Sequence, residues 1–144
     1  MCLEIKPGSC LNRAKEDVIC YKVVRLEVNE TISTPYQTAL ISNEVINGEK
    51  PFIAQNNRGK ELTEEAFEIQ YQDYCWSRVY GNAIHTFATK NGAKTEATEL
   101  RAFLPGHKYR VYKCIIPKDT LYYEGDFEGK KSFASQKIVF KEAV

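Results

Sequence analysis

The sequence predicts a single α+β domain spanning residues 1–144, with a mainly antiparallel sheet of about six strands and two helices. The chain of 144 residues has the size of one ordinary domain. Its 43% hydrophobic residues, with seven Phe and nine Tyr, are enough to build a core. Short β-branched or aromatic segments also alternate with two segments of helical periodicity, which favours a mixed fold.

The strands are predicted from β-branched and aromatic residues between chain breaks. Residues 18–28 alternate apolar and polar side chains towards their end, and residues 34–36 are extended around a proline. In residues 38–55, two apolar segments flank Asn47-Gly48, a pair that accepts the positive φ angles of a hairpin turn. The other expected strands cover residues 75–80, 109–117, 121–123 and 137–140.

Two helices are predicted from caps and apolar spacing. Thr63 is a hydroxyl cap followed by two glutamates, which favours a helix of about three turns. Residues 89–104 form the second helix, which Pro105-Gly106 ends. Residues 1–17 are expected to be an irregular or loosely helical lead-in, and residues 125–129 a loop. One side of the second helix carries Ala93, Ala97, Leu100 and Leu104.

Charge and hydropathy exclude several classes of partner. The net charge is +1 and no stretch holds more than two like charges in a row, so no nucleic-acid partner is expected. No apolar segment approaches the length of a membrane span, and residues 1–7 lack the features of a signal peptide. We therefore expect a cytoplasmic protein without a membrane partner.

The five cysteines do not have the spacing of a zinc site or a redox pair. Cys20 and Cys114 lie inside apolar segments and are expected to be reduced core residues. The acidic residues Glu124, Asp126 and Glu128 match no calcium loop and are interpreted as solvated. No metal and no cofactor are predicted.

His85-Thr86 is the first candidate ligand-binding element. It follows a glycine turn and precedes the second helix, so its backbone amides could receive an anion at the edge of a cleft. The alternative is that His85 only packs or caps at this turn. No catalytic group is assigned.

Four further residues complete the candidate ligand site. Arg78, flanked by aromatic residues, suits a phosphate beside a stacked base, although it could equally cover an aromatic surface. Tyr122 and Tyr123 offer stacking faces, but strand alternation points one of them inward. Lys118 is a possible phosphate contact or simply a solvated turn residue.

Six segments spread along the chain form a recognisable set, and they are residues 19–23, 34–37, 81–87, 111–118, 122–125 and 134–140. Together they resemble small uncharacterised proteins of gut Bacteroidales and their phages. This resemblance covers most of the chain and implies no particular activity.

The chain also has a hydroxyl motif followed by a helix, then a strand ending Ile116-Pro117-Lys118, and then a late strand. This order resembles the carboxyl-terminal half of ADP-ribosyltransferase-type folds. Those enzymes carry Ser-Thr-Ser where this chain has His85 and Thr86, and residues 135–138 offer no counterpart of their catalytic glutamate. The resemblance implies a nucleotide-shaped cleft without transferase chemistry. A two-histidine phosphoesterase is disfavoured as well, since neither histidine is followed two residues later by the required hydroxyl.

These observations predict a non-catalytic binding protein of bacterial or phage origin. It would sequester a small nucleotide-like ligand or inhibit a host protein. The alternative is an ADP-ribosyltransferase-like or phosphodiesterase-like enzyme acting on a nucleotide. A homodimer is expected to form through the exposed edge of the hairpin at Asn47-Gly48.

Overall fold

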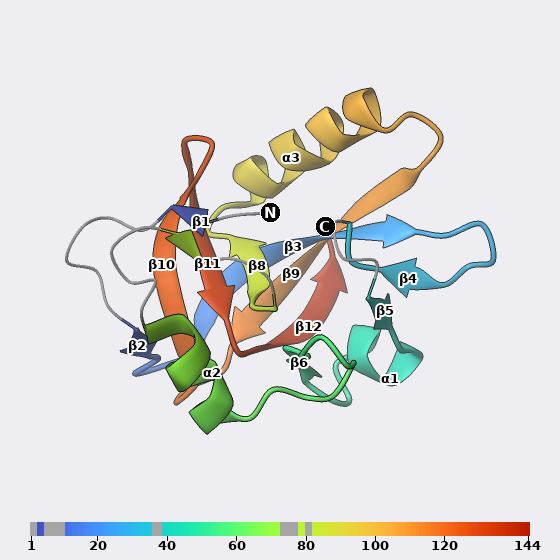
Figure 1. The fold of residues 1–144 in the computed structure, drawn as a ribbon. Coiled ribbons are helices and arrows are strands. Elements are labelled where there is room, and N and C mark those ends of the chain that lie inside the picture. Colours follow the sequence, from blue (N-terminus) through green and yellow to red (C-terminus); the bar gives the residue numbers. More distant parts are fainter. Residues whose placement is uncertain (1–2, 5–10, 36–38, 73–77, 80–81) are drawn as a thin grey trace.

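The computed structural model describes residues 3–4, 11–35, 39–72, 78–79 and 82–144, which form twelve strands and three helices (Figure 1). The predicted mixture of helices with a mainly antiparallel sheet is confirmed, because every strand pair in this part of the chain is antiparallel. The predicted numbers of strands and helices are too low. The elements without counterparts in the prediction are mostly two to four residues long, which is too short to show periodicity.

Six strands have four residues or more, and they are β3 (Val18–Leu26), β8 (Ile84–Phe87), β9 (Lys108–Ile116), β10 (Leu121–Phe127), β11 (Lys130–Ser135) and β12 (Lys137–Ala143). The two-residue strands are β1 (Leu3–Glu4), β2 (Asn12–Arg13), β4 (Ile32–Ser33), β5 (Leu40–Ile41), β6 (Phe52–Ile53) and β7 (Arg78–Val79). The helices are α1 (Asn43–Ile46), α2 (Glu64–Gln72) and α3 (Lys90–Phe103). Among the described helices, none has the length and apolar character that a membrane span requires.

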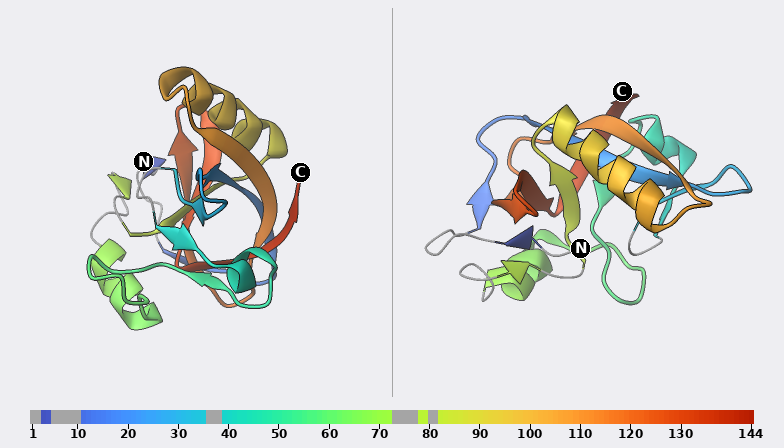
Figure 2. Two further views of the ribbon diagram at one scale, coloured as in Figure 1. Left: turned by 90° about the vertical axis from the view of Figure 1, so that its right-hand side faces the viewer. Right: turned by 90° about the horizontal axis from the view of Figure 1, so that it is seen from above.

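The sheet curves back on itself because residues 130–143, which form β11 and β12, pair with both sides of the group β8-β3-β9. The order of neighbouring strands is β6-β12-β9-β3-β8-β11-β10-β1-β7. Only Gln136 separates β11 from β12, yet β11 pairs with β8 and β12 pairs with β9. The bend at Gln136 therefore joins β8, β3 and β9 into a barrel-like wall around a common interior (Figure 2). The Gln136 side chain holds this bend by donating from Nε2 to the Leu62 carbonyl at 3.0 Å.

Two apolar clusters lie on opposite faces of this wall. The larger fills the interior and includes Cys20 and Val24 of β3. The smaller lies under α3 and includes Val23, as expected from the alternation of side chains along a strand. Helix α3 is confirmed as predicted, with the Thr89 hydroxyl accepting from Gly92 N at 3.0 Å. Its buried apolar side chains are Ala93, Ala97 and Leu100, whereas Leu104 is partly exposed.

The predicted hairpin at Asn47-Gly48 is wrong. These residues end the short helix α1 instead, with Asn47 as the C-cap and Gly48 at φ +81°. Positive φ angles terminate helices as readily as they form hairpin turns, so the dipeptide alone does not separate the two outcomes. The flanking strand β5 pairs with β4, and β6 pairs with β12. The hairpin edge on which the homodimer was expected is therefore not formed.

We expect Gly48→Ala to lower the free energy of unfolding by about 2 kcal/mol or more. A Cβ at this position would lie 2.7 Å from the Phe140 carbonyl oxygen, and the backbone would also be strained at positive φ. Gly59→Ala is the matched control, because Gly59 has φ +76° but no atom within 4 Å of its added Cβ. Urea unfolding of both variants checks this, and an equal loss at the two positions would contradict the close contact with Phe140.

The loop predicted at residues 125–129 is instead part of a hairpin between β10 and β11. Glu128 and Gly129 both have positive φ, as in a type I′ turn, and Phe127 pairs with Lys130. The end of β10 and the start of β11 carry charged residues, which lower strand propensity, and the sequence pattern therefore predicts a loop. Ion pairs across the hairpin offset the low strand propensity, and one of them joins Lys131 and Glu124 at 3.3 Å.

Three further predictions concern the first helix, the lead-in and the strand at residues 75–80. Helix α2 begins where predicted, with Ala66 N donating to the Thr63 hydroxyl at 3.2 Å. The described residues of the lead-in, residues 1–17, include the strands β1 and β2, which both pair with β10. The strand predicted over residues 75–80 is described only at β7, and the rest lies outside the described residues.

Candidate functional site

A gap between β3 and β8 creates the main candidate site. The two strands are paired only at Tyr21 and Phe87. Four residues further along the same edge of β3, Arg25 pairs with Ser33 of β4. Between these two points, no described strand pairs with this edge of β3. The sheet therefore opens at Lys22 and Val23, where a regular ladder would otherwise close it.

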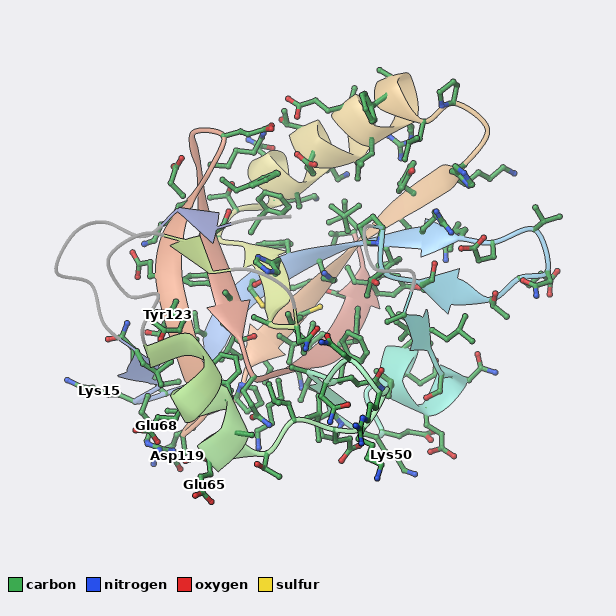
Figure 3. All side chains as sticks on the ribbon, viewed as in Figure 1. Lys15, Lys50, Glu65, Glu68, Asp119 and Tyr123 are labelled. Atoms are coloured by element: carbon green, nitrogen blue, oxygen red, sulfur yellow. The ribbon has the colours of Figure 1, made fainter. Side chains whose placement is uncertain are left out.

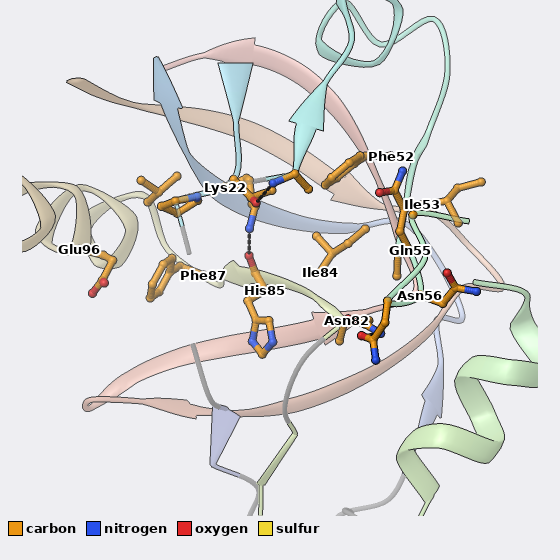
Figure 4. A pocket seen from close by; sticks show the side chains of 18 residues that line it. Lys22, Phe52, Ile53, Gln55, Asn56, Asn82, Ile84, His85, Phe87 and Glu96 are labelled. Carbon is orange, nitrogen blue, oxygen red and sulfur yellow. Dashed lines mark hydrogen bonds between the residues drawn. The ribbon is translucent and has the colours of Figure 1, made fainter. Parts of the chain in front are cut away.

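A cavity of about 530 Å³ occupies this opening (Figure 4). The size falls in the range of pockets that hold small molecules. Its walls come from β3, residues 34, 35 and 39 after β4, the segment 52–59 that includes β6, β8 with the two residues before it, and Glu96 of α3. Apolar side chains and carboxamides make up most of the lining, and they include Val23, Phe52, Ile53, Ile84, Gln55, Asn57 and Asn82.

Lys22 is the buried cation of this cavity. Its side chain lies on the interior face of β3 between Cys20 and Val24, and the residue is 7% exposed. Lys22 Nζ donates to the His85 carbonyl oxygen at 2.9 Å, which bridges the gap where β3 and β8 have separated. No carboxylate among the described residues forms an ion pair with it. Burial lowers the pKa of Lys22 to about 8.

The His85 imidazole is buried, and the residue is 7% exposed. Neither ring nitrogen has a hydrogen-bond partner among the described residues. Burial, with a smaller effect of the Lys22 charge, lowers the pKa of His85 to about 3. The ring is therefore neutral near pH 7 and offers one donor and one acceptor.

Carboxamides line the outer part of the cavity. The Asn56 side-chain oxygen accepts from the backbone amides of Arg58 and Lys60 and thereby holds its loop. Asn82 Nδ2 donates to the Asn57 side-chain oxygen at 3.2 Å, which links that loop to the start of β8. These contacts place amide donors and acceptors beside apolar walls, an arrangement that suits a flat heteroaromatic molecule.

Two thiols beside Lys22 complete the surroundings. Cys20 and Cys114 lie opposite each other on β3 and β9, and both are 0% exposed, which confirms the predicted core cysteines. Burial raises the pKa of Cys20 to about 12, and it also raises the pKa of Cys114. Both thiols are therefore protonated and poor nucleophiles.

We expect iodoacetamide to alkylate Cys20 and Cys114 at least about 100-fold more slowly in the folded protein than in denaturant, because access requires opening of the fold. Peptide mass spectrometry after timed labelling at pH 8 measures each site separately. Equal rates in the two states at either cysteine would contradict the burial of that thiol.

The structure places the predicted element His85-Thr86 differently from the sequence analysis. Both residues lie within β8, paired with Ala134 and Phe133 of β11, and not at a strand-to-helix turn. Strand alternation separates their side chains, so that Thr86 is fully buried beside Cys20 while His85 lines the cavity. The expected backbone anion site before α3 therefore does not include these residues.

Of the other predicted residues, Tyr122, Tyr123 and Lys118 do not line this cavity. Tyr123 is 0% exposed and packs against Phe67 near α2 (Figure 3), so it is the inward-facing residue of its pair. Tyr122 is half-buried, with its ring edge-on to Phe133 at 5.8 Å. Lys118 is exposed at a turn, where its backbone amide donates to Asp17. Arg78 lies on β7, and its side chain is outside the described part of the structure.

An acidic cluster formed by the middle of α3 and the turn between β10 and β11 surrounds a lysine of the same chain. Oxygen atoms of Glu96, Glu99 and Glu128 lie within 4.8 Å of one another. Lys130 Nζ lies 3.5–3.9 Å from all three carboxylates. The cluster is therefore interpreted as an ion-pair network around this lysine.

Apart from His85, the residues that line the cavity were not predicted from the sequence, because they come from five separated segments. Lys22 could have been found, since it interrupts an otherwise apolar strand segment. Comparison of the chain with family models, with curated proteins and with solved structures finds no match.

Proposed function

We propose that the protein is a non-catalytic binding protein that holds a small nucleotide-like ligand in the cavity between β3 and β8. The observation that carries the proposal is the cavity itself, about 530 Å³ in volume, with apolar walls, a carboxamide edge and one buried cation. Such a combination of apolar surface with a few polar groups is typical of small-molecule sites.

The lining supports a nucleoside or nucleoside monophosphate in particular. Phe52 and Ile53 offer apolar contact to a base, and Asn82 offers hydrogen bonds to its edge. Lys22 is the one cation among the described lining residues, and it suits a single phosphate or carbonyl oxygen. A triphosphate would require more positive charge than this lining provides.

The ionisable groups favour binding over catalysis. A general base works best with a pKa near the working pH, and the His85 imidazole, with a pKa of about 3, is far below that range. The thiols of Cys20 and Cys114 are too basic to ionise near pH 7. Lys22, with a pKa of about 8, is the one of these four groups that ionises near neutral pH, and no base is assigned beside it, so we expect a nucleotide-like ligand to be released unmodified.

A retention assay tests the proposal. The protein is incubated with a panel of nucleosides, nucleoside monophosphates, cyclic nucleotides and NAD-derived nucleotides, freed of unbound compound, denatured and chromatographed. We expect recovery of an intact nucleoside or monophosphate. A new product peak would make the protein an enzyme, and no retention of any compound would overturn the proposal in favour of a protein partner.

A pair of isoleucine variants locates the binding. Ile53→Trp adds a bulky ring to the cavity lining and is expected to abolish retention. Ile19→Trp is the matched control, because Ile19 is 52% exposed on β3 and does not line the cavity. Equal retention by the two variants would place the ligand elsewhere.

A further inference from the structure

We propose that Lys22 is a covalent capture site for small aldehydes and ketones, which its amine binds as a reversible imine inside the cavity between β3 and β8. The inference goes beyond the noncovalent ligand proposed above and requires only that the cavity admit a small carbonyl compound.

The position of Lys22 carries the inference. The side chain is almost completely buried, lines a cavity large enough for an aromatic aldehyde, and forms no ion pair among the described residues. A buried ammonium group without a counter-charge is costly, so burial raises the fraction of neutral amine above that of a solvated lysine. Lysines desolvated in this way are the ones that react with carbonyl substrates to form Schiff bases.

The groups around Lys22 do not restore its charge. Its Nζ donates to the His85 carbonyl, the His85 ring is neutral, and the thiols of Cys20 and Cys114 are protonated near pH 7. With the pKa of Lys22 lowered to about 8, roughly a quarter of it is neutral at pH 7.5, against about 0.1% of an ordinary solvated lysine. One N–H of the neutral amine keeps the bond to His85, and the nitrogen lone pair stays free.

The reaction consumes only the carbonyl compound and releases water. The Lys22 nitrogen forms a bond to the carbonyl carbon, and the C=O π electrons move to the oxygen, which takes up the proton lost from nitrogen. The resulting carbinolamine loses its hydroxyl, with one added proton, as water. Nitrogen then gives up its remaining proton, leaving a neutral C=N bond. No oxidant or reductant takes part, and hydrolysis reverses the step.

Reductive trapping tests the inference on the wild-type protein. The folded protein is treated at pH 7.5 with a limiting amount of salicylaldehyde and with sodium cyanoborohydride, which adds hydride to the imine carbon and leaves a stable secondary amine. Digestion and mass spectrometry then measure occupancy at each lysine. We expect occupancy at Lys22 to exceed that at exposed lysines such as Lys15 and Lys60 by at least about 10-fold.

Two comparisons make the result decisive. Ile53→Trp should lower labelling of Lys22, while Ile19→Trp should not, because only the first residue lines the cavity. Labelling spread over the exposed lysines with Lys22 unmodified, or labelling of Lys22 only after denaturation, would overturn the inference. A protein that retains nucleosides but leaves Lys22 unmodified refutes the imine alone. A protein labelled at Lys22 that retains no nucleotide refutes only the noncovalent proposal.

Discussion

Phe140→Ala is expected to lower the free energy of unfolding by about 3–5 kcal/mol, because it removes a large buried ring and leaves a cavity in the core. Phe140 is 1% exposed in the main apolar cluster. Its ring contacts Tyr112 edge-on, with 5.6 Å between ring centroids, and lies 6.2 Å from Phe52. These contacts join β9, β12 and β6, so the substitution affects the wall of the barrel and the strand that borders the candidate site.

Chemical denaturation with a matched control checks this expectation. Phe103→Ala removes the same ring from the end of α3, where Phe103 is 82% exposed, and should change the stability by no more than about 0.5 kcal/mol. A loss of less than 1 kcal/mol for Phe140→Ala would show that β12 does not pack over the core in the manner described.

Acidification is expected to destabilise the protein strongly through His85. The pKa of this imidazole is about 3 in the folded protein, because of burial and the nearby Lys22 charge, and about 6.5 when the chain is unfolded. Between these values the unfolded state binds one proton more than the folded state, so stability falls as the pH falls. The contribution lost between pH 6.5 and pH 3 is on the order of 4 kcal/mol.

The variant His85→Gln isolates this contribution, since glutamine has a similar size and does not titrate. Unfolding free energies of both proteins are measured from pH 7 to pH 3.5, and the wild type is expected to lose stability more steeply. The lowered pKa values of the Glu27 and Glu64 carboxyl groups also affect the acid range, but they are present in both proteins and cancel in the difference. Parallel curves would contradict a buried neutral imidazole.

The sequence predicted the long elements of this fold because their patterns are local. Strand β3, strand β9 and helix α3 each show their periodicity within nine or more residues. The two errors at Asn47-Gly48 and at residues 125–129 arise where one local pattern fits two structures. An Asn-Gly pair ends a helix or turns a hairpin, and a charged segment is a loop or a strand whose charges pair with a neighbour.

The candidate site was less predictable because it is a product of topology. Lys22 and His85 are 63 positions apart, and what brings them together is the separation of β3 from β8 after a single paired position. No spacing in the sequence reports such a gap. A lysine within an apolar strand indicates an unusual environment, but its neighbours become known only from the arrangement of the strands.

Chemical-shift mapping examines, residue by residue, whether the opening between β3 and β8 binds a nucleotide-like ligand as proposed. The ¹⁵N-labelled protein is titrated with a panel of nucleosides and nucleoside monophosphates. We expect saturable shift changes concentrated on the backbone amides of Lys22, Gln55, Asn82 and His85, which line the cavity. An absence of shifts with every compound, or shifts gathered instead around Lys118 and Tyr122, would contradict binding in this opening.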